Sequence, residues 1–161
     1  MAILRSLVHL LFMVVTVVPW ALSVLIAAPF MNSTQIYWLC VGWLKLAVRS
    51  GRWMLGIRNE VIGWENLPLG QTDAAILLVK HQSTWETFSM PALMPHPLAY
   101  VFKKELLYVP FFGWAMAMLR PIAIDRDNPK AALKHVAKKG DELLKDGVWV
   151  LIFPEGTRVP F

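Results

Sequence analysis

Residues 74–86 read AAILLVKHQSTWE, an apolar run followed by a short polar segment. The continuous apolar run 74–79 predicts a fully buried β-strand. Ser83 and Thr84 are residues that favour turns and helix starts, and they predict a helix over residues 85–90. His81 is therefore expected where a core strand ends, at the edge of a sheet and facing a crevice.

His81 and Glu86 form a candidate acid–base pair across this turn. A carboxylate that accepts a hydrogen bond from one ring nitrogen fixes the tautomer and leaves the other nitrogen free to take a proton from a hydroxyl. The pair supplies the histidine and acid of a catalytic triad without its serine, so the substrate's own alcohol is the expected nucleophile. Taken alone, this spacing is also typical of an ordinary capped helix start.

Residues 80–86 are the first of three blocks of interest, and two further blocks follow in the chain. Residues 103–114 read KKELLYVPFFGW and lead to RPIAIDR at 120–126, and residues 153–158 read FPEGTR. Alone, the last block is typical of a tight turn after a strand, in which Pro154 fixes one dihedral angle and Gly156 supplies a positive φ. Arg158 can also bind a phosphate through two parallel hydrogen bonds, and backbone N–H groups near Gly156 can help to line an anion site.

In this order, the three blocks resemble those of the glycerolipid acyltransferases, most closely the 1-acyl-sn-glycerol-3-phosphate acyltransferases. The resemblance covers residues 61–158. It implies an enzyme that moves a fatty acyl group from a thioester, either acyl-CoA or acyl carrier protein, to the hydroxyl of lysophosphatidic acid, forming phosphatidic acid. It implies no cofactor beyond this co-substrate. One residue departs from the family, whose commonest first block has Asp where this chain has Glu86.

The resemblance also implies roles for individual residues. It implies that His81 is a general base and that Glu86 orients it. It implies that the substrate-binding residues are Lys104, Glu155, Gly156, Thr157 and Arg158. Two alternatives stay open. Lys103 and Lys104 also fit a solvated pair at a strand end, and Arg126 also fits a local ion pair with Asp125 or Asp127.

The first 30 residues carry much of the chain's apolar character, which at 57% hydrophobic residues is high for a soluble protein. Residues 6–30 contain no Lys, Arg, Asp or Glu. As a helix they would reach about 37 Å, against a hydrocarbon core of about 30 Å. They predict a membrane helix, spanning or re-entrant, that Pro19 kinks without ending it. A signal peptide with Arg5 as its charge is the alternative.

A second apolar segment, residues 36–48, is too short to cross a membrane by itself. Three basic residues at helical spacing and three tryptophans surround its polar side: Lys45, Arg49 and Arg52, and Trp38, Trp43 and Trp53. This composition predicts a helix that lies in an anionic membrane interface. The alternative is the solvated basic face of an ordinary amphipathic helix.

The net positive charge of the chain comes from its first 59 residues. Residues 1–59 contain five Lys and Arg residues and no acidic residue, whereas the remainder has eleven of each sign. The net charge of +5 therefore points to lipid rather than nucleic acid as partner. The bases at 45, 49, 52 and 58 predict that the following domain lies on the cytoplasmic side, here the cytoplasmic face of the inner membrane. The single cysteine, Cys40, has no partner for an intrachain disulfide.

We expect two parts, a helical membrane anchor over residues 1–58 and a catalytic domain over 59–161. In the second part, predicted strands alternate with predicted helices, which indicates an α/β fold with its site at the strand ends. A short strand and turn are expected over residues 61–68. Further strands are expected at 74–79, 98–102, 121–124 and 148–153, and helices at 85–90, 109–119 and 129–145. Asn128 caps the last helix and Gly147 ends it. We expect its apolar face to comprise Leu133, Val136, Ala137 and Leu144.

Other kinds of site find little support. The remaining histidines and Cys40 are scattered without metal-ligand spacing, so no metal site is predicted. Ser83 lacks the Gly-x-Ser-x-Gly elbow of serine hydrolases, and there is neither a Walker loop nor a dinucleotide fingerprint.

Residue 161 follows closely on the FPEGTR block, so we expect later strands of the family to be missing, an open sheet edge, and low activity. A non-catalytic, membrane-bound lipid-binding protein and an acyltransferase acting on another lysophospholipid are the alternative functions.

Overall fold

The computed structural model describes residues 1–70 and 74–158, so the last three residues of the predicted catalytic domain lie outside the described part. It confirms the predicted α/β class. Four parallel strands form one sheet in the order β1-β4-β2-β3. The strands are β1 (Ile76–Leu78), β2 (Leu98–Lys103), β3 (Ile122–Ile124) and β4 (Trp149–Ile152). Because all four are parallel, the segments that leave their carboxyl ends emerge at one edge.

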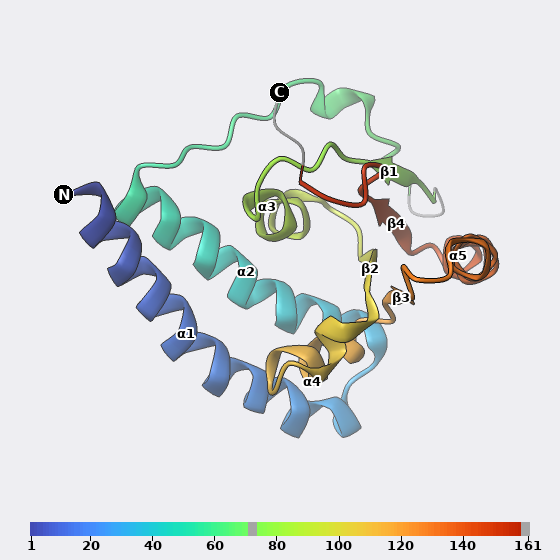
Figure 1. Cartoon of the computed structure of the whole chain (residues 1–161), viewed down its shortest axis with the longest axis horizontal. Coiled ribbons are helices and arrows are strands. Elements are labelled where there is room, and N and C mark those ends of the chain that lie inside the picture. Colours follow the sequence, from blue (N-terminus) through green and yellow to red (C-terminus); the bar gives the residue numbers. More distant parts are fainter. Residues whose placement is uncertain (71–73, 159–161) are drawn as a thin grey trace.

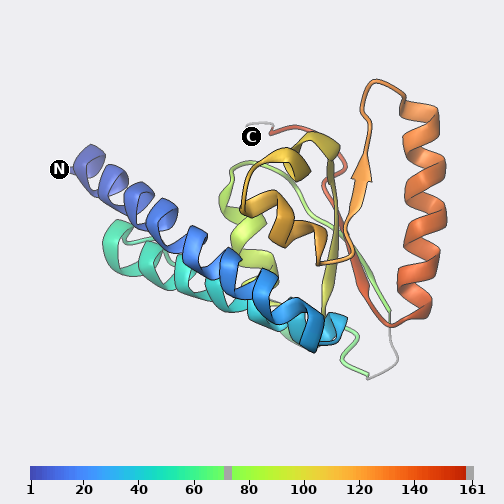
Figure 2. The ribbon, with the colours of Figure 1, turned by 90° about the horizontal axis from the view of Figure 1, so that it is seen from below.

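Helices cover both faces of the sheet (Figure 2). On one side lies α5 (Pro129–Lys145), which packs on β3 and β4. On the other side lie α3 (Trp85–Leu93), α4 (Phe112–Ala117) and the N-terminal helices. Short 3₁₀ helices occupy Trp64–Asn66 and Lys104–Tyr108. The inner strands β2 and β4 carry most of the buried side chains of the sheet, including Leu98, Trp149 and Leu151, and Ile122 of β3 is equally buried.

The first 55 residues form an antiparallel hairpin of α1 (Ala2–Ala27) and α2 (Ser33–Leu55), joined through the 3₁₀ turn Ala28–Phe30 (Figure 1). A capping box starts α2, in which Asn32 and Gln35 bond each other's backbone N–H groups at 2.9 Å. Side chains also join the two helices, as the Trp20 Nε1–H donates to the Leu39 carbonyl at 2.8 Å. The hairpin is therefore held by polar as well as apolar contacts.

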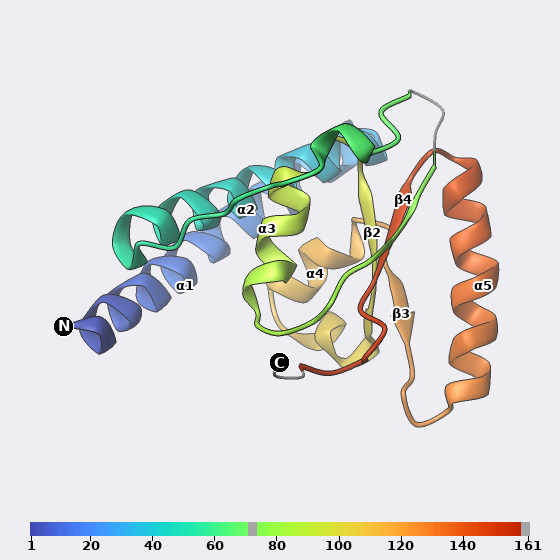
Figure 3. The same ribbon diagram turned by 90° about the horizontal axis from the view of Figure 1, so that it is seen from above.

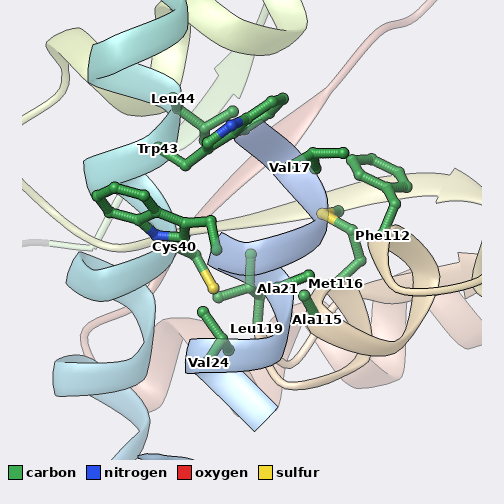
Figure 4. Close-up of a pocket in the computed structure, with 11 residues that line it drawn as sticks. Val17, Ala21, Val24, Cys40, Trp43, Leu44, Phe112, Ala115, Met116 and Leu119 are labelled. Atoms are coloured by element: carbon green, nitrogen blue, oxygen red, sulfur yellow. The ribbon is translucent and has the colours of Figure 1, made fainter. Parts of the chain in front are cut away.

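The hairpin shares a hydrophobic core with the sheet. Tyr37 and Val41 of α2 belong to the same buried cluster as Leu98 and Trp149. A small apolar cavity of about 50 Å³ lies where α1, α2 and α4 meet (Figure 4). The thiol-bearing Cys40 is one of its lining residues. The anchor helices are thus packed into the structure of the α/β part.

Helix α1 keeps a long apolar face open. The segment Ala2–Phe30 is long and apolar enough to cross a membrane, and only 11% of its most apolar window is buried. Pro19 lies inside α1 without ending it, as predicted. The exposed apolar side chains of α1 include Ile3, Leu4, Leu7, Leu10, Leu11, Val14, Val15 and Ile26. Apart from its ends, this face offers no charged group to water.

The prediction that three tryptophans of α2 lie in a membrane interface is wrong for Trp43. Trp43 is only 7% exposed and donates its indole N–H to Thr16 Oγ1 of α1 at 3.1 Å. Trp43 is therefore part of the contact between α1 and α2. Trp53 is exposed, and Lys45 lies over the Trp38 ring at 5.4 Å. Trp53 and Lys45 thus keep the outward placement that the sequence predicts, whereas Trp38 is half-buried and packs against the core cluster.

The prediction that residues 74–79 form a fully buried strand is also wrong. β1 is an edge strand paired only with β4 among the described residues, and Ile76 and Leu78 are 55% and 69% exposed. Both lie on the α5 side of the sheet, since their register partners Val150 and Ile152 pack in the buried cluster that contains Leu143 of α5. Helix α5 covers β3 and β4 but not β1. An apolar run alone does not distinguish an edge strand from a central one.

Two predicted element boundaries need correction. Of the short strand and turn expected over residues 61–68, the structure has the turn but no strand within that segment, since Gly63 has a φ of 79° and precedes the 3₁₀ turn at Trp64. Helix α3 continues through Pro91, where the sequence predicts its end. A proline removes the hydrogen bond to the carbonyl four residues earlier. The Tyr100 hydroxyl donates to that Thr87 carbonyl at 3.1 Å instead.

Helix α5 matches its predicted bounds. Asn128 accepts from the Ala131 N–H at 3.2 Å, and Gly147 follows with a φ of 73°. Its predicted apolar face is wrong at two positions, because Leu133 is 72% exposed and Ala137 is also exposed, while Leu143 is the fully buried residue. The helix rotates so that Leu143 meets Ile122 and Val150.

We predict that Gly51 of α2 is required for close packing against α3. A Cβ added at Gly51 would lie 2.4 Å from the Trp85 ring, whereas one added at Gly140 of α5 meets no atom within 4 Å. Gly51→Ala should therefore destabilise the protein by about 1–3 kcal/mol. Gly140→Ala, the matched control, should leave stability unchanged or raise it by about 0.5–1 kcal/mol. Thermal unfolding in detergent measures both, and equal shifts would contradict the packing argument.

Candidate active site

The predicted site residues gather at the carboxyl edge of the sheet. His81 follows β1, Lys104 follows β2, Asp125 follows β3 and Glu155 follows β4. Because β4 lies between β1 and β2, the FPEGTR block lies between the other two blocks along this edge. Helix α3, which carries Glu86, lies between α2 and the sheet (Figure 3).

Two contacts join His81 to the FPEGTR block. Its imidazole stacks on the Phe153 ring with centroids 4.2 Å apart and an interplanar angle of 25°. Its backbone N–H donates to Glu155 Oε2 at 3.4 Å. Gly156, with a φ of 64°, donates its N–H to the Phe153 carbonyl at 3.0 Å, so the block forms the predicted tight turn. The turn thereby brings a ring and a carboxylate to the histidine.

Glu86 lies beside His81 but does not form the predicted hydrogen bond. Its Oε2 is 3.8 Å from His81 Nδ1, and this buried nitrogen has no hydrogen-bond partner among the described residues. The carboxylate accepts instead from Ser83, which lies only three residues earlier. The longer Glu side chain reaches back to its own helix start, which an Asp is less able to do.

The environment of Glu86 favours its ionised form. Burial raises the pKa of the Glu86 carboxyl, but hydrogen bonds from its own N–H, from the Ser83 hydroxyl and from the N–H groups of Ser83 and Gln82 outweigh this and lower the pKa below its ordinary value. A carboxylate therefore faces the imidazole at neutral pH.

The lysines of the second block are paired with acids. Lys104 forms an ion pair with Asp125, and Lys103 lies 3.6 Å from Glu105. The hydrogen bond to Asp125 raises the pKa of Lys104, so the ammonium stays charged. Asp125 is thereby taken up by Lys104, and exposed Arg126 forms no ion pair with either predicted acid among the described residues.

The remaining residues of the third block are open to solvent. Thr157 and Arg158 are exposed, and within residues 1–70 and 74–158 Arg158 forms no ion pair. Its guanidinium is thus available to an anion. The described residues contain no cluster of three or more potential metal ligands.

An apolar groove begins beside the first block. It is open to solvent, has a volume of about 540 Å³ and lies between α1, α2 and α3. Its lining is mostly apolar, with residues from Leu10 to Val17 on α1 and Phe88 on α3, while Thr84 and Trp85 lie at the first block. This volume is in the range of small-ligand pockets. The groove links the anchor to the site.

The sequence interpretation did not identify Phe153 and Trp85 as parts of the site. Phe153 supports the imidazole, and Trp85 fixes the start of α3 by donating its indole N–H to Asn59 Oδ1 at 2.7 Å. For Phe153, the signal was its place at the end of a strand in the same block as Glu155. No sequence signal links Trp85 to Asn59, which is 26 residues away.

The chain matches a protein-family model and several named proteins. The family model described as Acyltransferase matches residues 58–160. The chain is 48% identical over 158 residues to a protein of Pseudomonas aeruginosa named 1-acyl-sn-glycerol-3-phosphate acyltransferase. Proteins of the same name from Saccharomyces cerevisiae and Cocos nucifera are 35% identical over 105 residues and 28% identical over 158 residues.

These matches differ in coverage. They include 98%, 65% and 98% of this chain, in the order given, but only 60%, 34% and 49% of the relatives. The chain thus spans between a third and three fifths of the length of these relatives. No solved structure matches it significantly.

Proposed function

Because this chain belongs to the Acyltransferase family, we propose that it transfers a fatty acyl group from a thioester to the free hydroxyl of 1-acyl-sn-glycerol 3-phosphate, forming phosphatidic acid. One observation carries the proposal. The His81 imidazole stands at the carboxyl edge of the sheet with an ionised Glu86 carboxylate 3.8 Å from its Nδ1. The names of the relatives support this acceptor. The donor is an acyl-CoA or an acyl carrier protein.

The reaction needs one base and no covalent enzyme intermediate. His81 Nε2 takes the proton of the acceptor hydroxyl as its oxygen attacks the thioester carbonyl. The carbon–sulfur bond then breaks, and the imidazolium returns the proton to the leaving thiolate. The products are an ester and a free thiol. Glu86 stabilises the imidazolium that forms between these steps.

The apolar groove is suited to a fatty acyl chain. Its walls come from α1, α2 and α3, and it reaches the first block at Thr84 and Trp85. A chain lying there is removed from water and points its carbonyl end toward the block that contains His81. Burial of apolar surface contributes roughly 25 cal/mol per Å², so the groove supplies binding energy without contacting the reacting atoms.

The phosphate of the acceptor requires cations at the same edge. Arg158 is exposed and has a planar fork of donors that suits a phosphate. Lys104 is the second candidate, and its pairing with Asp125 fixes the ammonium near the ends of β2 and β3. Glu155, Gly156 and Thr157 shape the turn that presents Arg158.

Membrane attachment explains the hairpin. The exposed face of α1 is apolar, and the first 59 residues carry basic but no acidic side chains. We infer that this face lies in the membrane and that the site lies on the cytoplasmic side, where Lys and Arg concentrate next to membrane segments. The lipid acceptor then reaches the site without crossing water.

The proposed activity predicts that His81 is indispensable. In membranes that contain the chain, His81→Ala should lower kcat at least about 10²-fold, the usual contribution of a general base. Glu86→Gln should lose most activity, and Glu86→Asp should retain a substantial part of it. The measurement is phosphatidic acid formation from lysophosphatidic acid and acyl-CoA or acyl carrier protein. Lipid binding without any turnover by the parent would favour a non-catalytic lipid-binding protein.

Arg158 should matter for the phosphate and not for the chemistry. Arg158→Ala should reduce kcat/KM for lysophosphatidic acid by at least about tenfold, because a charge-assisted contact is lost. Monoacylglycerol, which has no phosphate, should be a poor substrate for the parent and lose little more in the variant. Arg158→Lys should also be poor, because an ammonium cannot form two parallel bonds. An equal loss for both acceptors would mean that Arg158 does not act through the phosphate, and the acceptor of the acyltransferase would then be unknown.

Attachment through α1 predicts resistance to washing. The protein should sediment with membranes and stay there in high salt and in alkaline carbonate. Replacing the exposed Leu7, Leu11 and Val15 by Ser should release it, because each change removes apolar burial. Leu133→Ser is the matched control, since Leu133 is equally exposed but lies on α5. Release of the parent by salt alone would refute embedding.

A further inference from the structure

Ser83 holds the Glu86 carboxylate at both oxygens. The Ser83 backbone N–H lies 3.1 Å from Oε1 and 3.0 Å from Oε2, and the Ser83 hydroxyl donates to Oε2 at 2.9 Å. These contacts leave the carboxylate little freedom to rotate. A glutamate has one more rotatable bond than an aspartate, so its carboxylate needs such a constraint to stay in one place.

The direction of the Ser83 hydroxyl is itself determined. Its oxygen accepts the Trp85 backbone N–H at 3.0 Å, so its single proton is left for Glu86. Trp85 is fixed in turn by the Asn59 side chain and by the close approach of Gly51. The serine is therefore oriented by the packing of α3 on α2.

Oε2, the oxygen that takes the Ser83 hydroxyl proton, is also the one that faces the imidazole. It lies 3.8 Å from His81 Nδ1, a buried nitrogen with no other hydrogen-bond partner among the described residues. Hydrogen bonds in catalytic sites are often long before substrate binds and shorten afterwards. A shift of about 1 Å by a carboxylate anchored in this direction is enough to complete the bond.

We propose that Ser83 is a positioning residue, whose hydroxyl and N–H hold the Glu86 carboxylate against the Nδ1 side of His81. The carboxylate then favours the tautomer with its proton on Nδ1 and leaves Nε2 as the basic nitrogen. The catalytic consequence rests on the proposed acyl transfer, whereas the tautomer does not. Ser83 thus offsets the extra length of Glu86.

A plain helix start is the competing explanation, and it accounts for two of the contacts. The Trp85 N–H that donates to the Ser83 hydroxyl, and the Ser83 N–H that donates to the Glu86 carboxylate, are both typical of a capped helix start. The contact that a capping box lacks is the hydrogen bond from the Ser83 hydroxyl to Glu86 Oε2. A capping role alone predicts lower stability and no effect on His81.

Nitrogen NMR of the detergent-solubilised protein tests the positioning directly. The four histidines, His9, His81, His96 and His135, are few enough to assign by substitution. In the parent, the neutral His81 ring should carry its proton on Nδ1. Ser83→Ala and Glu86→Ala should both shift the ring toward the Nε2–H form, while Ser83→Thr, which keeps the hydroxyl, should not. Asn128→Ala is the matched control, because it also removes a helix-start hydrogen bond, far from the site. An unchanged His81 signal in Ser83→Ala overturns the proposal.

Kinetics test the consequence. Ser83→Ala should lower kcat about ten- to a hundredfold with little change in KM, the pattern of a misplaced catalytic group. In a Glu86→Ala background, the same change should cost less than about twofold, because the residue that Ser83 positions is gone. An equal loss in both backgrounds overturns the proposal. A parent that transfers no acyl group refutes the proposed function, while the tautomer measurement still decides the role of Ser83.

Discussion

The parallel pairing of β4 between β1 and β2 is the constraint on which the site depends. Three separate sequence blocks, in which the contacting residues His81 and Glu155 are 74 positions apart, meet only because β4 bonds β1 on one side and β2 on the other. This register sets the FPEGTR turn directly beside His81, where Phe153 stacks on the imidazole and Glu155 accepts its backbone N–H. β4 is also among the most deeply buried strands, so the part of the sheet that joins the blocks is well protected.

Helix α2 of the hairpin packs directly against the start of α3, which belongs to the first block. α2 packs its inner face into the core cluster of the sheet, and its Gly51 receives the Trp85 ring from the start of α3. Trp85 in turn directs the Ser83 hydroxyl, which holds Glu86. The apolar helix hairpin is thus connected through successive packing and hydrogen bonds to the Glu86 carboxylate, which lies 3.8 Å from the imidazole.

Sequence patterns predicted those features that local chemistry determines. The Asn128 cap and Gly147 stop gave the bounds of α5, and the three blocks gave the location of the site at the strand ends. The errors concern tertiary context. Periodicity did not show that β1 lies at the edge, that Trp43 faces α1, or that Leu133 faces water, because each depends on which element packs opposite. Glu86 bonds Ser83 rather than His81 because a partner three residues away competes with a more distant ring.

The groove beside the first block gives the membrane anchor a second role under the proposed function. One wall is formed by α1, and Leu10 and Val14 of this wall also belong to the exposed apolar face of the same helix. A lipid tail that leaves the bilayer along α1 therefore remains against apolar surface until it reaches Thr84 and Trp85. The phosphate cannot follow it, since charge is costly to bury without a partner. It stays at the edge of the sheet, where Arg158 is exposed, and the hydroxyl between head and tail is brought to His81.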